Sequence, residues 1–270
     1  SAAAALSIQH KIEGQNLQYL KKGTSSAEST TLSFWVKSNK TGTYIAELFD
    51  NDNQRQISQT YTISSANTWE KKTLTFAGDT TGALGNDNGS SFLVEFWLGA
   101  GSNYTSGTLN TSWNSNTNTN RVVGSVNLAD STANEWYITG IQLEAGTSAS
   151  DFEFLPIDVN LQRCSRYFTI MMKDNAENYQ GVVASFFTSS RMFFRLPHIV
   201  TMRTAPTLGT SGVTINDAQN GGVTGNTTFN NTFPGVTGSS VEIGGSFNTT
   251  YSGHVDLAGG SGSLTADAEL

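Results

Sequence analysis

The sequence has little charge, one cysteine and few prolines, and each shortage excludes a class of protein. Charged residues make up 14% of the 270 residues while aromatic residues make up 10%, which is not the composition of a disordered chain. Four prolines are too few for a proline-rich linker protein. Because Cys164 is the single cysteine, no disulfide can form within the chain, and packing must stabilise the fold.

Basic residues and long apolar runs are also scarce. The chain holds 15 Lys and Arg against 22 Asp and Glu, for a formal net charge of -7. Nucleic-acid binding normally needs a clustered basic surface, so we do not expect it here. No apolar run approaches the roughly 20 residues of a membrane span, so we expect no membrane insertion.

The first half of the sequence is rich in alternating apolar and polar residues. A period of two is typical of antiparallel strands with one buried face. Strands separated by polar turns at roughly 8–12-residue spacing indicate a β-sandwich or jelly roll. The pattern predicts strands at residues 31–37, 42–49, 56–63, 70–76, 92–98, 121–128 and 136–144.

The alternation also predicts which side chains point inward. In residues 31–37 it places Leu32, Phe34 and Val36 on one face, and it places Ser33, Trp35 and Lys37 on the other. In residues 92–98 the phenylalanines and their apolar neighbours point inward, and Glu95 and Trp97 point outward.

A short amphipathic helix is expected near the middle of the chain, at about residues 156–167. Pro156 suits a first helical turn, because its missing N–H is not needed there. Asp158 near the start and Arg163 near the end match the helix dipole. Helical spacing also gives an apolar stripe, in which we expect Cys164 to be a small buried residue. The stripe comprises Ile157, Leu161, Cys164 and Phe168.

The remainder predicts a second β domain. Short strands are expected at residues 167–172, 212–215, 240–243 and 253–257. The tail after Arg203 has no Lys or Arg and is rich in small polar residues, so it fills a core poorly. Homo-oligomerisation would supply additional burial. We expect Leu161 and Cys164 to pack against their own copies.

The sequence is thus predicted to be all-β, with two domains joined by the helix. Residues 1–152 are expected to form an N-terminal jelly-roll β-sandwich. Residues 153–168 form the linker and short helix, and residues 169–270 form a C-terminal β-sandwich domain.

Several segments resemble a known family. Residues 34–38 (FWVKS), 42–44 (GTY), 61–63 (YTI) and 68–76 (TWEKKTLTF) resemble the carbohydrate-binding-module-like jelly rolls of bacteriophage virion proteins. The segment that follows them resembles the junction to a C-terminal β domain in phage tail-fibre and related receptor-binding proteins. The junction motifs are ITGIQLEAG at 138–146, FE at 152–153 and LQRCSRYF at 161–168. Residues 194–207 are similar to an M-R-x-x-P-T segment of that domain, and ADAEL at 266–270 resembles its last strand.

The resemblance implies a function without catalysis. It implies a virion location, in a tail fibre or similar appendage, and a trimer or other oligomer. The implied partners are other virion proteins and a host-surface glycan, and no cofactor is implied. Two alternatives remain open, namely a purely structural decoration or joining protein, and a polysaccharide depolymerase.

Glycan binding requires aromatic rings that stack on sugars. Trp97 is a candidate because it points away from the predicted core, and Tyr104 and Trp113 are candidates because they lie in a long polar loop at residues 99–120. Loops longer than about 15 residues are usually functional or disordered. The alternative is that each ring anchors its segment by burial. That structural role is assigned to three other tryptophans, Trp35, Trp69 and Trp136.

A depolymerase would need two carboxylates. Glycosidases place such a pair roughly 5–9.5 Å apart. Glu95 is the only carboxylate deep within an apolar run, and no evident second carboxylate accompanies it. The favoured interpretation is therefore an outward-facing strand glutamate, and the chain is not expected to be an enzyme.

A structural calcium ion is a further alternative, since two turns are rich in oxygen ligands. They contain Asp50, Asp52 and Asn53, and Asp79, Asp87 and Asn88. Neither matches an EF-hand loop, and Asp and Asn also favour turns by hydrogen bonding to their own backbone. No metal site is therefore predicted.

Overall fold

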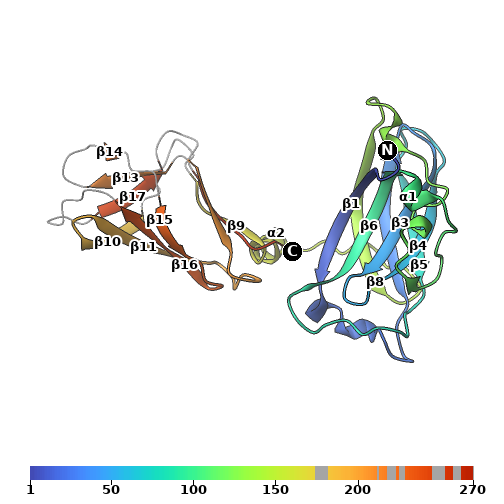
Figure 1. Cartoon of the computed structure of the whole chain (residues 1–270), viewed down its shortest axis with the longest axis horizontal. Helices are drawn as coiled ribbons and strands as arrows, with labels where there is room; N and C mark the ends of the chain where they lie inside the picture. Colours follow the sequence, from blue (N-terminus) through green and yellow to red (C-terminus); the bar gives the residue numbers. More distant parts are fainter. Residues whose placement is uncertain are drawn as a thin grey trace. The chain divides into compact units, whose positions relative to one another are not determined.

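The computed structural model describes residues 1–173, 182–211, 213–217, 223–224, 229–244, 253–257 and 263–269. It divides into two compact units, unit 1 (Ser1–Phe154) and unit 2 (Leu155–Glu269). Figure 1 shows unit 1 in blue through green and unit 2 in yellow through red. Antiparallel strands dominate both units, which confirms the all-β prediction.

Unit 1 is a sandwich of two antiparallel sheets. One sheet has the strand order β1-β6-β3-β4-β7 and the other has the order β5-β2-β8. Its strands are β1 (Ala5–Glu13), β2 (Thr30–Ser38), β3 (Gly42–Asp50), β4 (Arg55–Ile63), β5 (Glu70–Phe76), β6 (Ser90–Ala100), β7 (Asn114–Ser115) and β8 (Trp136–Ala145). Its short helices are η1 (Gly14–Asn16), η2 (Gln18–Leu20), α1 (Ser102–Thr105), η3 (Asn118–Asn120) and η4 (Leu128–Asp130).

The main core of unit 1 lies between these two sheets. Because side chains alternate along a strand, each sheet contributes every second residue to it. Phe34 of β2 makes edge-on ring contacts with Tyr61 of β4 and Phe96 of β6, with ring centroids 5.1 and 5.0 Å apart. Leu32 and Val36 are buried beside Phe34, as the alternation predicts.

The outer face of the larger sheet is also covered, by the chain that follows β6. Ile45 and Trp97 form a second buried cluster there with Val122, and Tyr104 packs against it. Strand β3 is therefore buried on both faces along most of its length. This second layer has a direct consequence for Glu95 and Trp97, which the alternation alone placed toward solvent.

The predicted strands of unit 1 differ from the structure in two places. Residues 121–128 form no strand but a series of turns, because Gly124 adopts a left-handed conformation (φ 86°) that interrupts an extended path. Strand β1 was not predicted, although Leu6, Ile8 and Ile12 alternate along it. It pairs with β6 along the edge of the larger sheet.

Unit 2 contains a sheet of order β14-β13-β17-β10-β11-β16-β15 and a sheet of order β12-β18-β9. Its core is small, and Met172, Met192, Phe194, Ile243 and Leu264 are among its buried members. Its strands are β9 (Phe168–Lys173), β10 (Val182–Thr188), β11 (Arg191–Pro197), β12 (Thr207–Ser211), β13 (Val213–Asp217), β14 (Val223–Thr224), β15 (Phe229–Phe233), β16 (Gly238–Gly244), β17 (Gly253–Leu257) and β18 (Ser263–Asp267).

Helix α2 (Ile157–Ser165) belongs to unit 2 and leads directly into β9. Pro156 precedes its first turn, and Asp158 and Arg163 lie at the expected ends. The expectation that Cys164 is buried was wrong for the single chain, because Cys164 is exposed and no residue of α2 is buried. No described helix is long and apolar enough to cross a membrane.

Candidate functional site

Three large aromatic side chains lie exposed on the outer side of the sheet β5-β2-β8. Trp35 is 43% exposed, Trp69 is 42% exposed and Tyr137 is 43% exposed. Together with Lys37 they form what we call the aromatic face. Each of these residues buries just over half of its surface, and the exposed parts of three rings on one sheet form an apolar patch of the kind that marks interaction sites.

Strand register brings these residues together. Lys37 of β2 is paired with Tyr137 of β8, and Trp35 is paired with Lys71 of β5 and with Thr139 of β8. Trp69 immediately precedes β5. Residues two apart on one strand share a face, and diagonal neighbours on adjacent strands lie roughly 7–8 Å apart. The sheet therefore holds Trp35, Lys37 and Tyr137 on one surface.

Lys37 connects two of the rings. Its Nζ lies 4.6 Å from the ring centroid of Tyr137 and 5.4 Å from that of Trp69. Both distances are within the range of cation–π attraction. Among the described residues Lys37 has no ion pair with a carboxylate, and its ammonium contacts the two rings instead. The ammonium thus carries a charge that no acidic side chain neutralises.

Trp35 is the ring most open to a ligand. No aromatic or cationic partner stacks on its indole in the part of the chain that the structure describes. A register shift opposite Ser33 and Trp35 marks a β-bulge in β8, where Gly140 has a positive φ of 59°. A Cβ at Gly140 would lie 3.4 Å from Cδ1 of Trp35 and 3.9 Å from the ring of Phe152. Both are ordinary contact distances, so it is the positive φ, and not the space around the indole, that favours glycine at this position.

Small polar side chains surround the rings. Thr73, Thr75 and Thr139 are exposed on the same outer surface of β5 and β8. Gln142 of β8 is occupied, because its amide donates to Ser150 and its Oε1 accepts from the backbone of Glu153. Hydroxyl groups beside exposed indoles match the mixed polar and apolar surface of a sugar ring.

The three sequence candidates for glycan binding lie elsewhere. The outward orientation expected for Trp97 was wrong. It is 2% exposed, its Nε1 donates to Oε2 of Glu47 at 2.8 Å, and its ring packs against Tyr104 at 5.5 Å. A ring buried in this way offers no face on which a sugar could stack.

Tyr104 and Trp113 are half-buried rather than open platforms. Trp113 packs against Phe92 at 6.0 Å and donates its Nε1 hydrogen to the carbonyl oxygen of Ala77 at 2.7 Å. Tyr104 is held against Trp97, and its carbonyl oxygen accepts from the backbone of Val122. Both rings therefore pin the segment after β6 to the sandwich.

The covered side of the larger sheet contains a buried pair of carboxylates. Glu47 of β3 is directly opposite Glu95 of β6, and neither is appreciably exposed. The Arg121 guanidinium bridges them, with its Nη2 2.9 Å from each carboxylate. Gln9 donates to the remaining oxygen of Glu95 at 2.9 Å. The predicted outward position of Glu95 was therefore wrong, and the second carboxylate that the sequence analysis did not find is Glu47.

This cluster changes the acidity of Glu47. Burial raises its pKa to about 7, and the opposing effects of Arg121 and of the Trp97 hydrogen bond are smaller. Two carboxylates share one guanidinium, so their negative charge exceeds the positive charge beside them. A proton on Glu47 near neutral pH relieves that excess.

The two acidic turns also meet, but around a lysine. Nζ of Lys22 contacts the carboxylate of Asp50, Oδ2 of Asp79 at 3.0 Å and the carbonyl oxygen of Gly82 at 2.9 Å. Arg55 adds a second cation at 2.7 Å from Asp79. No group of three or more metal-ligating His, Cys, Asp or Glu side chains is present among the described residues. The ammonium of Lys22 thus takes the position that a metal ion would need.

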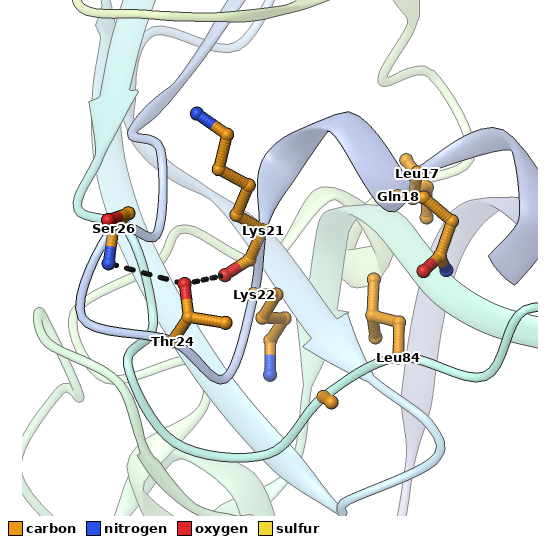
Figure 2. Close-up of a pocket in the computed structure, with 8 residues that line it drawn as sticks. Leu17, Gln18, Lys21, Lys22, Thr24, Ser26 and Leu84 are labelled. Carbon is orange, nitrogen blue, oxygen red and sulfur yellow. Dashed lines mark hydrogen bonds between the residues drawn. The ribbon is translucent and has the colours of Figure 1, made fainter.

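A cavity of about 490 Å³ opens next to this lysine. Its lining includes Leu17, Gln18, Lys21, Thr24, Ser26 and Leu84. Figure 2 shows that the side chains of Lys21 and Lys22 diverge, and that Thr24 links the carbonyl of Lys21 to the amide of Ser26. Lys21 pairs with Glu28 at 2.9 Å, and no aromatic side chain lines the cavity. It offers a sugar less than the aromatic face does.

The sequence held a signal for the aromatic face. Strand alternation placed Trp35 and Lys37 on one face, yet Trp35 and Trp69 were assigned to structural roles because they lie within or beside strong strand patterns. An outward tryptophan on a strand gains little from the core. The structure confirms that Trp35 and Lys37 lie on the face opposite to Phe34, while the structural role assigned to Trp35 and Trp69 stays a prediction. Trp136, by contrast, does pack against the core.

No protein-family profile matches the chain, and comparisons with curated proteins and with solved structures find no match.

Proposed function

We propose that unit 1 binds a host-surface glycan without catalysis, through the aromatic face. The observation that carries this proposal is the exposure of Trp35, Trp69 and Tyr137 on one sheet surface. Aromatic rings offer apolar area to the C–H groups of a sugar, while neighbouring hydroxyls meet its hydroxyls. An open sheet surface of this kind suits a segment of polysaccharide better than a single buried sugar.

A depolymerase is less well supported by the geometry. Glu47 and Glu95 face each other, but Arg121, Trp97 and Gln9 already occupy their oxygens. Both carboxylates lie under the segment that follows β6, where no exposed ring accompanies them. A glycosidase needs its acid and base open to the scissile bond. The pair is better explained as part of the packing of unit 1.

The biological setting proposed here follows the sequence resemblance, namely attachment of a virion to its host by a tail fibre or similar appendage. Individually weak glycan contacts become strong when several copies are joined in one particle, because later contacts form at high effective concentration. We propose that copies associate through the apolar stripe of α2, where Ile157 is 79% exposed and Leu161 is 60% exposed. A purely structural virion component is the alternative, and it predicts no glycan binding.

The direct test is a glycan-array screen of the full-length chain, followed by affinity measurements on Trp35→Ala. We expect Trp35→Ala to weaken binding about thirtyfold, as for an aromatic residue that carries about 2 kcal/mol of binding energy. Tyr19→Ala is the matched control, because Tyr19 is 51% exposed but lies on η2, outside the aromatic face. Binding that survives Trp35→Ala, or that Tyr19→Ala reduces equally, would contradict the assigned surface.

The assembly is tested separately by light scattering. We expect the full-length chain to be an oligomer and Leu161→Asp to shift it toward monomer, because a buried carboxylate is costly at an apolar contact. A monodisperse monomer of the unmodified chain would remove the proposed contact.

A further inference from the structure

We propose that the ligand of the aromatic face is an anionic saccharide, whose acidic group is bound by Lys37. This inference rests on the proposed function and specifies the chemical class of its ligand. It starts from a lysine that is placed among aromatic rings, on a chain whose formal net charge is -7. On such an acidic chain, an ammonium group without a carboxylate partner is unexpected.

The rings fix the position of this ammonium. Nζ of Lys37 lies over both Tyr137 and Trp69, so a long and flexible side chain is restrained at the centre of the face. Restraint lowers the entropy that the lysine loses when a ligand binds. Cation–π contacts hold an ammonium without cancelling its charge, whereas an ion pair would offset that charge. Lys37 therefore offers a positioned positive charge to which an anion can bind.

The nearby charges favour the same conclusion. Lys71, the strand partner of Trp35, is exposed and forms no close ion pair among the described residues. Glu144 lies close enough to feel its charge, but the carboxylate of Glu144 accepts hydrogen bonds from Ser150. Glu135 accepts a hydrogen bond from the hydroxyl of Tyr137. It lies two residues before Tyr137 in the sequence, whereas the strand partner of Trp35 lies two residues after Tyr137. Lys37 and Lys71 therefore both lie close to Trp35, and Glu144 offsets part of the charge of Lys71 but is not paired with Lys37.

An ammonium recognises carboxylate, sulfate and phosphate alike, because it acts as a point charge with three donors. The shared chemistry is a negative charge attached to a sugar ring that can stack on Trp35. A neutral sugar would stack equally well and could accept a hydrogen bond from Lys37, but it would leave the charge of Lys37 unmatched. The charge therefore discriminates between ligands that the rings cannot distinguish.

The test uses the full-length chain and pairs of polymers that differ in charge. Alginate is compared with its carboxyl-reduced form, and dextran sulfate is compared with dextran. We expect the charged member of at least one pair to bind about tenfold more tightly, as for one charge-assisted hydrogen bond, and to lose this advantage in high salt. Lys37→Met should abolish the difference within that pair, because methionine keeps the contact with the rings and lacks the charge.

Lys21→Met serves as the control, since it removes one positive charge from an exposed lysine outside the aromatic face. Equal binding of charged and neutral polymers, with Lys37→Met unchanged and Trp35→Ala defective, would overturn the anionic ligand and leave glycan binding intact. Equal losses in Lys37→Met and Lys21→Met would attribute the effect to net charge and overturn the role of Lys37. Binding to no polymer of either charge would overturn both proposals.

Discussion

The two outer faces of unit 1 obey the same strand alternation and end in opposite environments. On the larger sheet, outward residues such as Glu95 and Trp97 are buried under a second layer of chain. On the smaller sheet, Trp35 and Lys37 remain accessible, although Thr31 and Ser33 on the same side of β2 are buried. Alternation defines two sides of a strand, but only the rest of the chain decides which side meets water. The covered face supports the fold, and the open face is available to a ligand.

The substitution with the largest expected effect is Arg121→Met, which tests whether the covered face stabilises unit 1. The substitution keeps most of the side-chain length over Trp97 but leaves Glu47 and Glu95 without their cation. We expect the free energy of unfolding to fall by about 3–5 kcal/mol, as when one partner of a buried ion pair is removed. Denaturant unfolding measures the loss. Arg121→Lys keeps the charge and should lose less. A loss equal to that of Arg121→Met would contradict the electrostatic explanation.

Glu47→Gln tests the same face through its pH dependence. Burial raises the pKa of Glu47 from 4.5 to about 7 in the folded state. Between these values the unfolded chain releases a proton that the folded chain retains. The contribution to stability is therefore complete below pH 4.5 and is lost as the pH rises to about 7.

In Glu47→Gln this decline should disappear, which amounts to about 3 kcal/mol between acidic and neutral pH. Urea unfolding at several pH values measures it. Glu28→Gln, at an exposed surface pair with Lys21, should keep the decline of the parent chain. Identical pH profiles for Glu47→Gln and the parent chain would refute the raised pKa.

Trp97→Phe tests whether Trp97 stabilises the fold or binds the glycan. It removes the donor to Glu47 and leaves a buried carboxylate oxygen without that hydrogen bond. We expect a loss of about 2 kcal/mol in unfolding free energy, with glycan affinity unchanged. Calorimetry and affinity measurement on the same sample decide the matter. A stable variant with reduced affinity would return Trp97 to the list of ligand-binding residues.

The smallest expected effect concerns the open face. Gly140→Ala forces a side chain into a left-handed conformation in the bulge beside Trp35, and relief of this backbone strain is expected to shift the neighbouring indole. We expect a stability loss of about 1 kcal/mol, together with weaker glycan binding. Gly124→Ala provides the comparison, because Gly124 also has a positive φ but has open space around its Cβ position. It should lower stability alone. Equal binding defects in both variants would show that Trp35 is not being displaced.

Much of the first sandwich could be predicted because its signal is local. Residues 70–76 were predicted as a strand and form β5 with the same limits, and residues 31–37 fall within β2. The inward positions of Leu32, Phe34 and Val36 follow from a period of two and are confirmed by their burial.

The candidate site could be predicted only in part, because the surroundings of each side chain depend on residues that are far away in the sequence. Glu47 and Glu95 become a pair through strand register, and Arg121 reaches them from a segment that was expected to be a strand. No feature of the sequence around Trp97 predicts that Val122 and Tyr104 pack over it. Conversely, the alternation placed Trp35 and Lys37 on one face, and Trp35 remains exposed there because the segment after β8 covers only part of that face.

Lys22 has a consequence for how unit 1 depends on its surroundings. A bound ion would be exchanged with the solvent and would be removed by a chelator, whereas a lysine is attached to the chain that it stabilises. The link between Asp50 and Asp79 is therefore made by a side chain of the same polypeptide and forms as the chain folds.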